Sequence, residues 1–304
     1  MYISRREFIK TCAAMAGALG LTSSGLLKLQ KVLASEGAPP VIWLQGQGCT
    51  GCSTSLLNSI YYMTVDDLLL NYIDLEFHAT VMAGAGDLAV SAAEDARVAG
   101  GYVLVVEGAI PTGEGGRYCY LWEGMTALQA LEEFSKDAAF VLAVGTCAAY
   151  GGIAAGEPNP TAAVGVGDII HGKQVINIPG CPAHPDWIVG TIYHLLINGK
   201  APMLDRNGRP KGYYQRTVHT KCPNKHSFYD RALFAEELSE IGCLSKLGCK
   251  GMWTGADCPT RKWNSGAVGD YGVNWCVEAK SPCQGCTEPD FPDGKSPWYT
   301  LEHA

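Results

Sequence analysis

Outside its first 34 residues the sequence has no apolar run of about 18 residues, the length at which a helix can span a bilayer. It also has no internal repeat and no low-complexity tract. Basic residues are in the minority, since 23 Lys and Arg stand against 30 Asp and Glu, a net charge of −7. This charge argues against a nucleic-acid partner, and the composition is that of a globular chain.

The N-terminal segment has the features of an export signal. MYISRREFIK contains Arg5 and Arg6, an apolar stretch follows, and Ala34 is a small residue that suits a signal peptidase. We therefore predict a cleaved twin-arginine signal over residues 1–34, with a basic amphipathic helix as the alternative. This route exports proteins after folding and cofactor loading. The protein would then lie in the periplasm or on the outer face of the cytoplasmic membrane.

Removal of this segment makes the chain more acidic. Residues 1–34 hold five basic residues and one acidic residue, a net charge of +4. The remaining 270 residues therefore have a net charge near −11. Such a surface suits a basic partner, although an ordinary solvated acidic surface is an equally good explanation. The remaining length suffices for one large domain, or for a domain with an appendage.

Strand-like and helix-like segments alternate from Val41 to about Lys200. The predicted strands are VIWLQG, IDLEFHAT, YVLVVEGAI, AFVLAVGTC and KQVINIPGC. The predicted helices run through STSLLNSIYY, AVSAAEDARVAG, EGMTALQALEEFSK and HPDWIVGTIYHLLING. The alternation predicts an α/β fold in which helices cover both faces of a parallel sheet, within a domain of residues 35–205.

After about Arg206 the alternation stops, and turn-rich, cysteine-rich sequence follows. We predict a second, irregular domain over residues 206–304. Little in this segment could build an apolar core, so bound metal would help to hold it folded.

Twelve cysteines follow residue 34. Disulfides are the usual expectation in an exported protein, but disulfide scaffolds are usually small because they lack a core. Export after folding also allows thiols to enter a metal centre in the reducing cytoplasm. The spacing of the cysteines therefore has to decide between these possibilities.

Three predicted strands end in a glycine-cysteine element: LQGQGC with Cys49, AVGTC with Cys147 and NIPGC with Cys181. Cys52 completes a C-x-x-C pair with Cys49. Because ligands gather at the carboxyl edge of an open parallel sheet, these thiols can form one four-thiolate site. Zinc also binds four thiolates, but structural zinc sites usually use paired knuckles, and this half of the chain has one C-x-x-C pair.

The second half supplies one further group of candidate ligands. Its seven cysteines and one histidine suffice for two four-ligand sites: His219, Cys222, Cys243, Cys249, Cys258, Cys276, Cys283 and Cys286. Proline follows cysteine at Cys181, Cys222 and Cys258, which resembles iron-sulfur ligation. His219 could also be a surface histidine, but its spacing from Cys222 favours a ligand.

The sequence resembles the electron-transferring small subunit of nickel-iron hydrogenases from about Val41 to Tyr299. The segments that carry the resemblance are QGQGCTGCS, VVEGAIPTGEGGRYC, GTCAAYGGI, PGCPAHPDW, HTKCP, GCKGMWTGADCPTRKWN and CTEPDFPD. The resemblance implies a flavodoxin-like first domain, an iron-sulfur second domain and three clusters. A nickel-iron site would lie on a separate large subunit.

The resemblance also assigns each ligand to a cluster. Cys49, Cys52, Cys147 and Cys181 match the ligands of the proximal 4Fe-4S cluster, next to the catalytic metals. His219, Cys222, Cys243 and Cys249 match those of the distal 4Fe-4S cluster near the surface. Cys258, Cys283 and Cys286 match the ligands of the medial cluster.

Cys276 departs from the usual family pattern. Many members have proline here and a 3Fe-4S medial cluster, whereas NWCVEA offers a fourth thiolate. We expect a medial 4Fe-4S cluster, as in the nickel-iron-selenium branch, with a lower potential. An unliganded thiol at Cys276 is the alternative. Oxygen-tolerant relatives have two more cysteines, at positions that match Gly51 and Gly152, so their six-cysteine proximal cluster is not expected here.

Three further residues are singled out by their positions. Glu107 ends the strand YVLVVEG, where it could tune the proximal cluster, join a proton path or simply bind backbone amides. Cys119 is left over from the three ligand sets and is expected to be a buried structural thiol. His184, after Cys181 and Pro182, is expected to cap a helix or to pack.

The resemblance implies an electron relay within an enzyme that interconverts dihydrogen with two protons and two electrons. The expected partners are the hydrogenase large subunit, in an obligate heterodimer, and an acceptor such as a periplasmic multihaem cytochrome c or a membrane cytochrome. The main alternative is an iron-sulfur relay subunit of a related, non-hydrogenase oxidoreductase complex. A standalone ferredoxin-like carrier, a zinc module and a nucleotide-binding flavodoxin-like protein are rivals; the last lacks a phosphate loop.

Overall fold

The computed structural model describes residues 38–230 and 233–292. The predicted export signal over residues 1–34 and the last residues of the predicted second domain lie outside these ranges.

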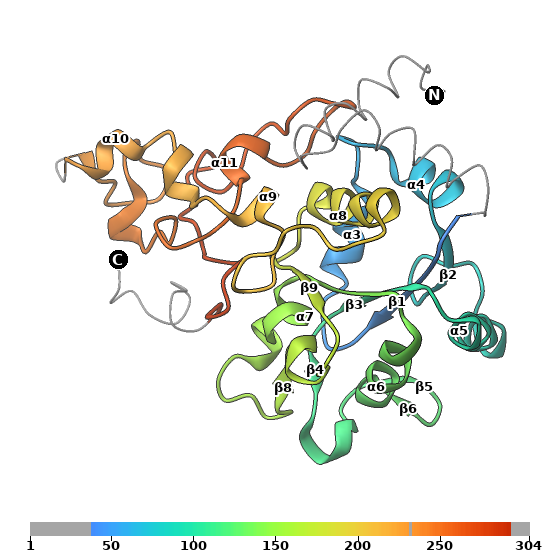
Figure 1. Ribbon diagram of the computed structural model, residues 1–304. Coiled ribbons are helices and arrows are strands. Elements are labelled where there is room, and N and C mark those ends of the chain that lie inside the picture. The colour runs from blue at the N-terminus through green and yellow to red at the C-terminus, as the bar shows by residue number, and fades with distance from the viewer. Residues whose placement is uncertain (1–37, 231–232, 293–304) are drawn as a thin grey trace.

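A five-stranded parallel sheet forms the centre of the first half (Figure 1). Its strands stand in the order β2-β1-β3-β7-β9, and every neighbouring pair is parallel. This is the strand order of flavodoxin-like folds, with the change of winding direction between β1 and β3. The predicted fold class is confirmed. The strand bounds are β1 Pro40–Gln45, β2 Asp74–His78, β3 Val103–Glu107, β7 Phe140–Val144 and β9 Val175–Ile178.

Helices cover both faces of the sheet because the strands are apolar on both sides. One face presents Trp43, Val105 and Leu142 to α3 (Gly51–Leu57), α4 (Val65–Asn71) and α8 (Pro185–Asn198). The other presents Ile42, Leu104 and Val141 to α5 (Asp87–Ala99), α6 (Ala127–Asp137) and α7 (Thr146–Tyr150). Alternate residues along each strand thus enter different cores, as strand geometry requires.

The helix after β1 is shorter than predicted. The sequence STSLLNSIYY was expected to be helical throughout, but α3 ends at Leu57, and α4 follows as a separate helix. Asn58 ends α3 by donating its side-chain amide to the Thr54 carbonyl at 2.7 Å. The Ser59 hydroxyl then donates to the Met63 carbonyl at 2.8 Å, which stabilises the turn that follows.

Short elements fill the loops of the first half. Two small antiparallel pairs join β4 to β8 and β5 to β6. The bounds of these strands and of the 3-10 helices are β4 Ile110–Pro111, β8 Ala163–Val164, β5 Tyr120–Trp122, β6 Met125–Thr126, η1 Gly113–Gly116, η2 Gly152–Ala155 and η3 Val166–Asp168.

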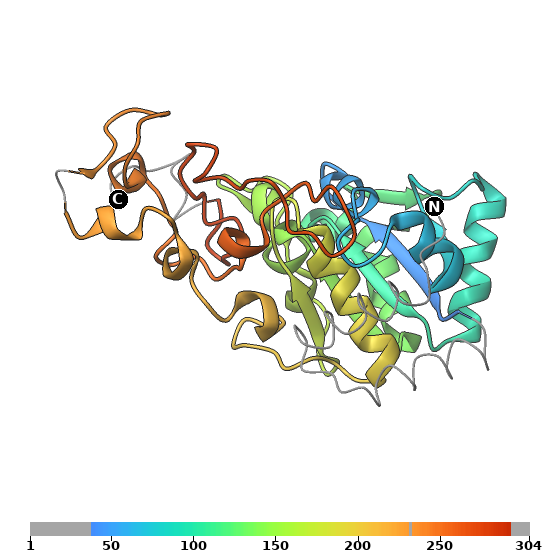
Figure 2. The ribbon, with the colours of Figure 1, turned by 90° about the horizontal axis from the view of Figure 1, so that it is seen from above.

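The described part of the chain after residue 205 is irregular and extends to one side of the sheet (Figure 2). The helices described in this part have four residues each and are linked by turns and isolated bridges. Leu244, Trp275 and Val277 nevertheless join the same apolar cluster as Trp43 and α8. The helix bounds are α9 Lys211–Tyr214, η4 Val218–Lys221, α10 Lys225–Phe228, η6 Leu244–Leu247 and α11 Cys258–Arg261.

A loop of the second half returns to the sheet domain. The ring of Tyr271 stacks on that of Tyr61 at a centroid distance of 5.3 Å, and the Gly269 amide donates to the Tyr61 carbonyl at 2.8 Å. Within residues 38–230 and 233–292, no helix has the length and apolar character needed to cross a membrane.

Candidate metal centres

The four predicted proximal ligands lie beyond the carboxyl ends of three strands. Cys49 and Cys52 stand at the start of α3 after β1, Cys147 lies in α7 after β7, and Cys181 follows β9. Their thiols are close enough to interact electrostatically: Cys52 with Cys147 and Cys181, and Cys49 with Cys147 and Cys181. The structure therefore brings these four side chains together at one edge of the sheet.

Glycines give these thiols their space. Gly145 has φ +86°, and a Cβ there would lie 2.5 Å from the Cys52 sulfur. Gly152 has φ +51°, and a Cβ there would lie 3.0 Å from the Cys147 sulfur and 2.8 Å from its backbone nitrogen. Both φ values also disfavour any residue with a side chain. A Cβ at Gly51 would lie 2.9 Å from the Cys49 sulfur, so Gly51 and Gly152 both adjoin predicted proximal ligands.

Glu107, at the end of β3, is 3 % exposed and holds the start of α3. Its Oε1 accepts from the backbone amides of Cys52 at 2.9 Å and Ser53 at 3.1 Å. Its Oε2 accepts from the Trp43 indole at 3.0 Å and from the Ser53 hydroxyl. The sequence left three roles open for Glu107: tuning the proximal cluster, joining a proton path or binding backbone amides. These contacts show that it binds backbone amides. A role in tuning the cluster stays a prediction.

The four predicted distal ligands, His219, Cys222, Cys243 and Cys249, line one cavity. The imidazole of His219 packs edge-on against Phe228 at a centroid distance of 4.8 Å. Its Nε2 is buried and has no hydrogen-bond partner among the described residues. Burial, with a smaller contribution from Lys225, lowers the pKa of His219 and favours the neutral form that binds metal. A buried, unpartnered imidazole nitrogen beside three thiols fits an iron-sulfur cluster.

The four predicted medial ligands lie between the other two groups. Cys258 begins α11, and its thiol interacts electrostatically with those of Cys286, Cys283 and Cys276. The Cys283 amide donates to the sulfur of Cys249, a predicted distal ligand, at 3.4 Å. The Cys181 amide lies close enough to the sulfur of Cys286 to lower the pKa of that thiol, and the two thiols interact electrostatically. The medial group is thus in contact with a ligand from each of the other groups.

Burial favours the protonated form of several of the ligand thiols in the absence of a cation. It is the largest influence on Cys52, whose pKa is raised well above its usual value, and on Cys222 and Cys286, whose pKa is raised to about 11 in each case. Neighbouring thiols raise the pKa of each of these cysteines further. Since thiolates are the metal-binding form, iron binding at these sites must release protons.

Across the described ranges, no three His, Cys, Asp or Glu side chains converge closely enough to hold a single metal ion. In a cluster the requirement is different, because each protein ligand binds its own iron.

His184 and Cys119 lie outside the three groups. His184 caps α8, which confirms one of its two expected roles: its Nδ1 accepts from the Asp186 amide at 3.1 Å. Its Nε2 therefore carries the proton and donates to the Lys262 carbonyl at 2.6 Å. Cys119 is half-buried rather than fully buried, and it packs against the core that includes α5 and α6.

Three buried polar residues near the ligands were not predicted. Thr146 precedes Cys147, Arg209 contacts the segment after Cys286, and Lys250 follows Cys249. The Lys250 ammonium is fully buried without a hydrogen-bond partner among the described residues. For Thr146 and Lys250 the sequence gives one hint, namely a neighbouring cysteine. For Arg209 it gives none, because Thr287 and Glu288, which Arg209 contacts near the medial ligands, lie 78 and 79 positions away in the chain.

Two known families match adjoining parts of the chain. The family described as "NADH ubiquinone oxidoreductase, 20 Kd subunit" matches residues 49–195. The family of the C-terminal part of the "NiFe/NiFeSe hydrogenase small subunit" matches residues 214–299.

Individual relatives match almost the whole chain. The periplasmic [NiFeSe] hydrogenase small subunit of Desulfomicrobium baculatum is 42 % identical, over 99 % of this chain and 100 % of its own length. The periplasmic [NiFe] hydrogenase small subunit of Solidesulfovibrio fructosivorans is 40 % identical, over 98 % and 93 %. A solved structure of the D. baculatum Ni-Fe-Se hydrogenase matches with a TM-score of 0.80 and 44 % identity, over 87 % of this chain and 100 % of that chain. The chain therefore belongs to the family of nickel-iron and nickel-iron-selenium hydrogenase small subunits.

Proposed function

We propose that this chain relays electrons through three iron-sulfur clusters between the nickel-iron site of a large subunit and an external acceptor. The clusters would be a proximal 4Fe-4S on Cys49, Cys52, Cys147 and Cys181, a medial 4Fe-4S on Cys258, Cys276, Cys283 and Cys286, and a distal 4Fe-4S on His219, Cys222, Cys243 and Cys249. Each cluster supplies a one-electron redox centre when bound.

The order of contacts between the three ligand groups is the observation that supports this proposal most strongly. A proximal ligand adjoins a medial one, because the thiols of Cys181 and Cys286 are close enough to interact electrostatically. A medial ligand touches a distal one, through the Cys283 amide and the Cys249 sulfur. A linear series of adjoining sites is what stepwise electron transfer requires, whereas isolated structural metal sites have no need of such contacts.

The protein residues have definable tasks in this relay. Glycines beside the proximal thiols leave room for a bulky inorganic core. The neutral imidazole of His219 would replace one thiolate, make the distal cluster less negative and raise its potential, which suits the site from which electrons leave. Fe-S binding would also stabilise the irregular C-terminal part.

The names of the relatives support the partner and the compartment that we propose. Relatives are named as periplasmic hydrogenase small subunits, and we infer that this chain pairs with a large subunit that carries nickel. We also propose export by the twin-arginine route and two domains that divide near residue 205. A net charge near −11 for the chain without its leader favours a basic acceptor, such as a multihaem cytochrome c.

Elemental analysis of the natively purified complex tests the proposal. Three 4Fe-4S clusters require about 12 iron atoms per copy of this chain, with one more iron and one nickel on the partner. Selenium would place the enzyme in the selenium branch. Zinc without iron would refute the relay.

A second candidate is a relay subunit of another oxidoreductase complex. It is favoured by the match of residues 49–195 to a subunit family of NADH ubiquinone oxidoreductase. Iron without nickel in the native complex would support it over the hydrogenase.

A further inference from the structure

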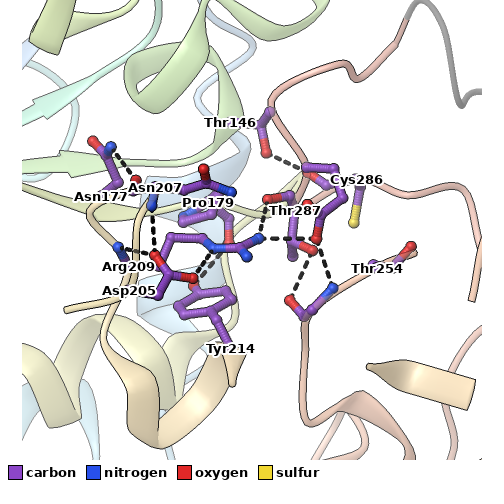
Figure 3. Close-up of polar contacts among 12 residues, drawn as sticks. Thr146, Asn177, Pro179, Asp205, Asn207, Arg209, Tyr214, Thr254, Cys286 and Thr287 are labelled. Carbon is purple, nitrogen blue, oxygen red and sulfur yellow. Dashed lines mark hydrogen bonds and ion pairs between the residues drawn. The ribbon is translucent and has the colours of Figure 1, made fainter. Parts of the chain in front are cut away.

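A buried polar network connects the ligand loops of the predicted proximal and medial clusters (Figure 3). Thr146 is 1 % exposed and directly precedes Cys147. Its hydroxyl donates to the carbonyl of Cys286, 140 residues away in the sequence. The same oxygen accepts from the amide of Gly180 at 2.9 Å, directly before Cys181. One hydroxyl thus contacts the segments that carry two proximal ligands and one medial ligand.

Cys181 and Cys286 also approach each other at this junction. The backbone amide of Cys181, a predicted proximal ligand, lies close enough to the sulfur of Cys286, a predicted medial ligand, to lower the pKa of that thiol. This contact depends on the relative position of the two segments that Thr146 connects. The Thr146 hydroxyl thus forms a hydrogen-bonded bridge between the two cluster sites, and the Cys181 amide lies at the same junction.

Arg209 holds the medial side of this bridge. It is 6 % exposed, and its Nη1 donates to the Thr287 carbonyl at 3.1 Å and to Glu288 Oε1 at 2.9 Å. Glu288 Oε1 also accepts from the Gly255 amide at 2.6 Å, three residues before Cys258. The Thr287 hydroxyl donates to the Gly255 carbonyl at 3.0 Å. Arg209 therefore fastens the segments that carry Cys286 and Cys258 to each other.

The proximal side is fastened by the turn that carries Arg209. Asp205 Oδ2 accepts from Arg209 Nε at 2.8 Å, and the Arg209 guanidinium lies over the Tyr214 ring at 5.4 Å. The Tyr214 hydroxyl donates to the Pro179 carbonyl at 2.9 Å, and Asn177 near the end of β9 donates to the Asn207 carbonyl at 2.8 Å. Figure 3 shows these residues converging from β9, from the turn and from the C-terminal segment.

We propose that Thr146 and Arg209 are positioning residues that hold the proximal and medial clusters in register for electron transfer. The inference rests on the proposed function. With both clusters bound, these residues would support the transfer of one electron from the reduced proximal cluster to the oxidised medial cluster, in which no covalent bond would form or break. By joining the Cys286 carbonyl to the Gly180 amide, Thr146 keeps the Cys181 amide near the Cys286 sulfur. Amides near ligand sulfurs raise cluster potentials because they stabilise the more negative, reduced form.

Thr146→Val tests this because it removes the hydroxyl and keeps the shape. In the native heterodimer, a redox titration followed by electron paramagnetic resonance should show a lower medial midpoint potential. The magnetic interaction between the reduced proximal and medial clusters should weaken. Thr146→Ser, which keeps the hydroxyl, should restore both readouts to the wild-type values.

Thr191→Val is the matched control. Thr191 is a fully buried threonine whose hydroxyl donates to the Trp187 carbonyl within α8 at 2.6 Å, so its loss should change neither readout. If Thr146→Val does not assemble, Arg209→Lys keeps the charge but cannot bind Asp205 and Glu288 together, and it should lower the same midpoint. Variants with full iron content and wild-type medial potential and coupling would overturn the inference. A wild-type complex without iron would instead overturn the proposed function.

Discussion

Cys276 is exposed, but its neighbours Trp275 and Val277 are 3 % exposed each and anchor its segment in the core. Its thiol lies close enough to that of Cys258 to interact with it electrostatically. A thiol held beside the predicted medial ligands by anchored neighbours suits a fourth ligand better than an unliganded side chain.

Cys276→Pro should convert the medial cluster to a 3Fe-4S form. The substitution removes one thiolate and reproduces the residue found in many family members. Iron per copy of this chain should fall from about 12 to about 11 atoms, and the medial potential should rise because a negative ligand is lost. Iron analysis and a redox titration measure both. Unchanged iron and potential would mean that Cys276 is not a ligand.

His219→Cys should lower the distal potential. A fourth thiolate makes the cluster more negative than an imidazole ligand does, so the reduced state becomes less favourable. Electron exit to the acceptor should slow, while hydrogen-isotope exchange at the partner's metals should stay unchanged. His226→Gln is a suitable control because His226 is exposed and outside the distal cavity. A distal potential equal to that of the wild type would argue against ligation by His219.

At the scale of elements, α8 is buried along almost its whole length and contributes to the core on one face of the sheet. His194 lies in this helix at 8 % exposure, and neither ring nitrogen has a hydrogen-bond partner among the described residues. Burial, and secondarily Lys200, lowers the pKa of His194. The helix therefore contains an imidazole that resists protonation in the folded state.

This has a consequence for acid stability. The imidazole of the unfolded chain takes up a proton below about pH 6.5, whereas the folded one does so only at lower pH. The stability that His194 contributes is therefore present above about pH 6.5 and is lost as the pH falls toward its folded pKa, at about 1.4 kcal/mol per unit of difference. The melting midpoint of wild type should fall more than that of His194→Leu between about pH 7.5 and about pH 5.5. Equal falls would show that His194 titrates normally.

The elements were predictable where burial produces a local pattern. The apolar runs around Val105 and Leu142 identified strands that are buried on both faces, and the cysteines that follow such strands were expected at one edge. The Thr146 and Arg209 network was not predictable. Its hydrogen bonds join residues 140 and 79 positions apart, so no spacing in the sequence indicates them. The early end of α3 depends on side-chain hydrogen bonds of Asn58 and Ser59. The spacing of apolar residues in the sequence does not predict such bonds.

At the scale of the whole molecule, the two halves differ in how they are stabilised. The sheet has an apolar core on each of its faces. The described part after residue 205 consists of four-residue helices and turns, and its few core residues pack onto the sheet domain. Bound iron would therefore contribute more to the order of the second half than to that of the first.

Iron removal should expose this difference. After oxidative destruction of the clusters and chelation of iron, backbone amides of residues 214–292 should exchange with solvent much faster, while those of β1, β3 and β7 should stay protected. Hydrogen-deuterium exchange of the same sample before and after treatment measures both, with the sheet strands as an internal control. Unchanged protection after residue 214 would contradict a stabilising role for the clusters.

The Glu107 carboxylate occupies the position beside the first amides of α3. Flavodoxin-like sheets bind a nucleotide phosphate where the winding direction changes, between β1 and β3, with helix-opening amides as donors. Here the amides of Cys52 and Ser53 at that point already bind the carboxylate from β3. A mononucleotide would meet an occupied, negatively charged position, and repulsion between carboxylate and phosphate would exclude it. The fold thus keeps the strand order of nucleotide-binding flavodoxin-like proteins, while Glu107 accepts the hydrogen bonds that a phosphate would need.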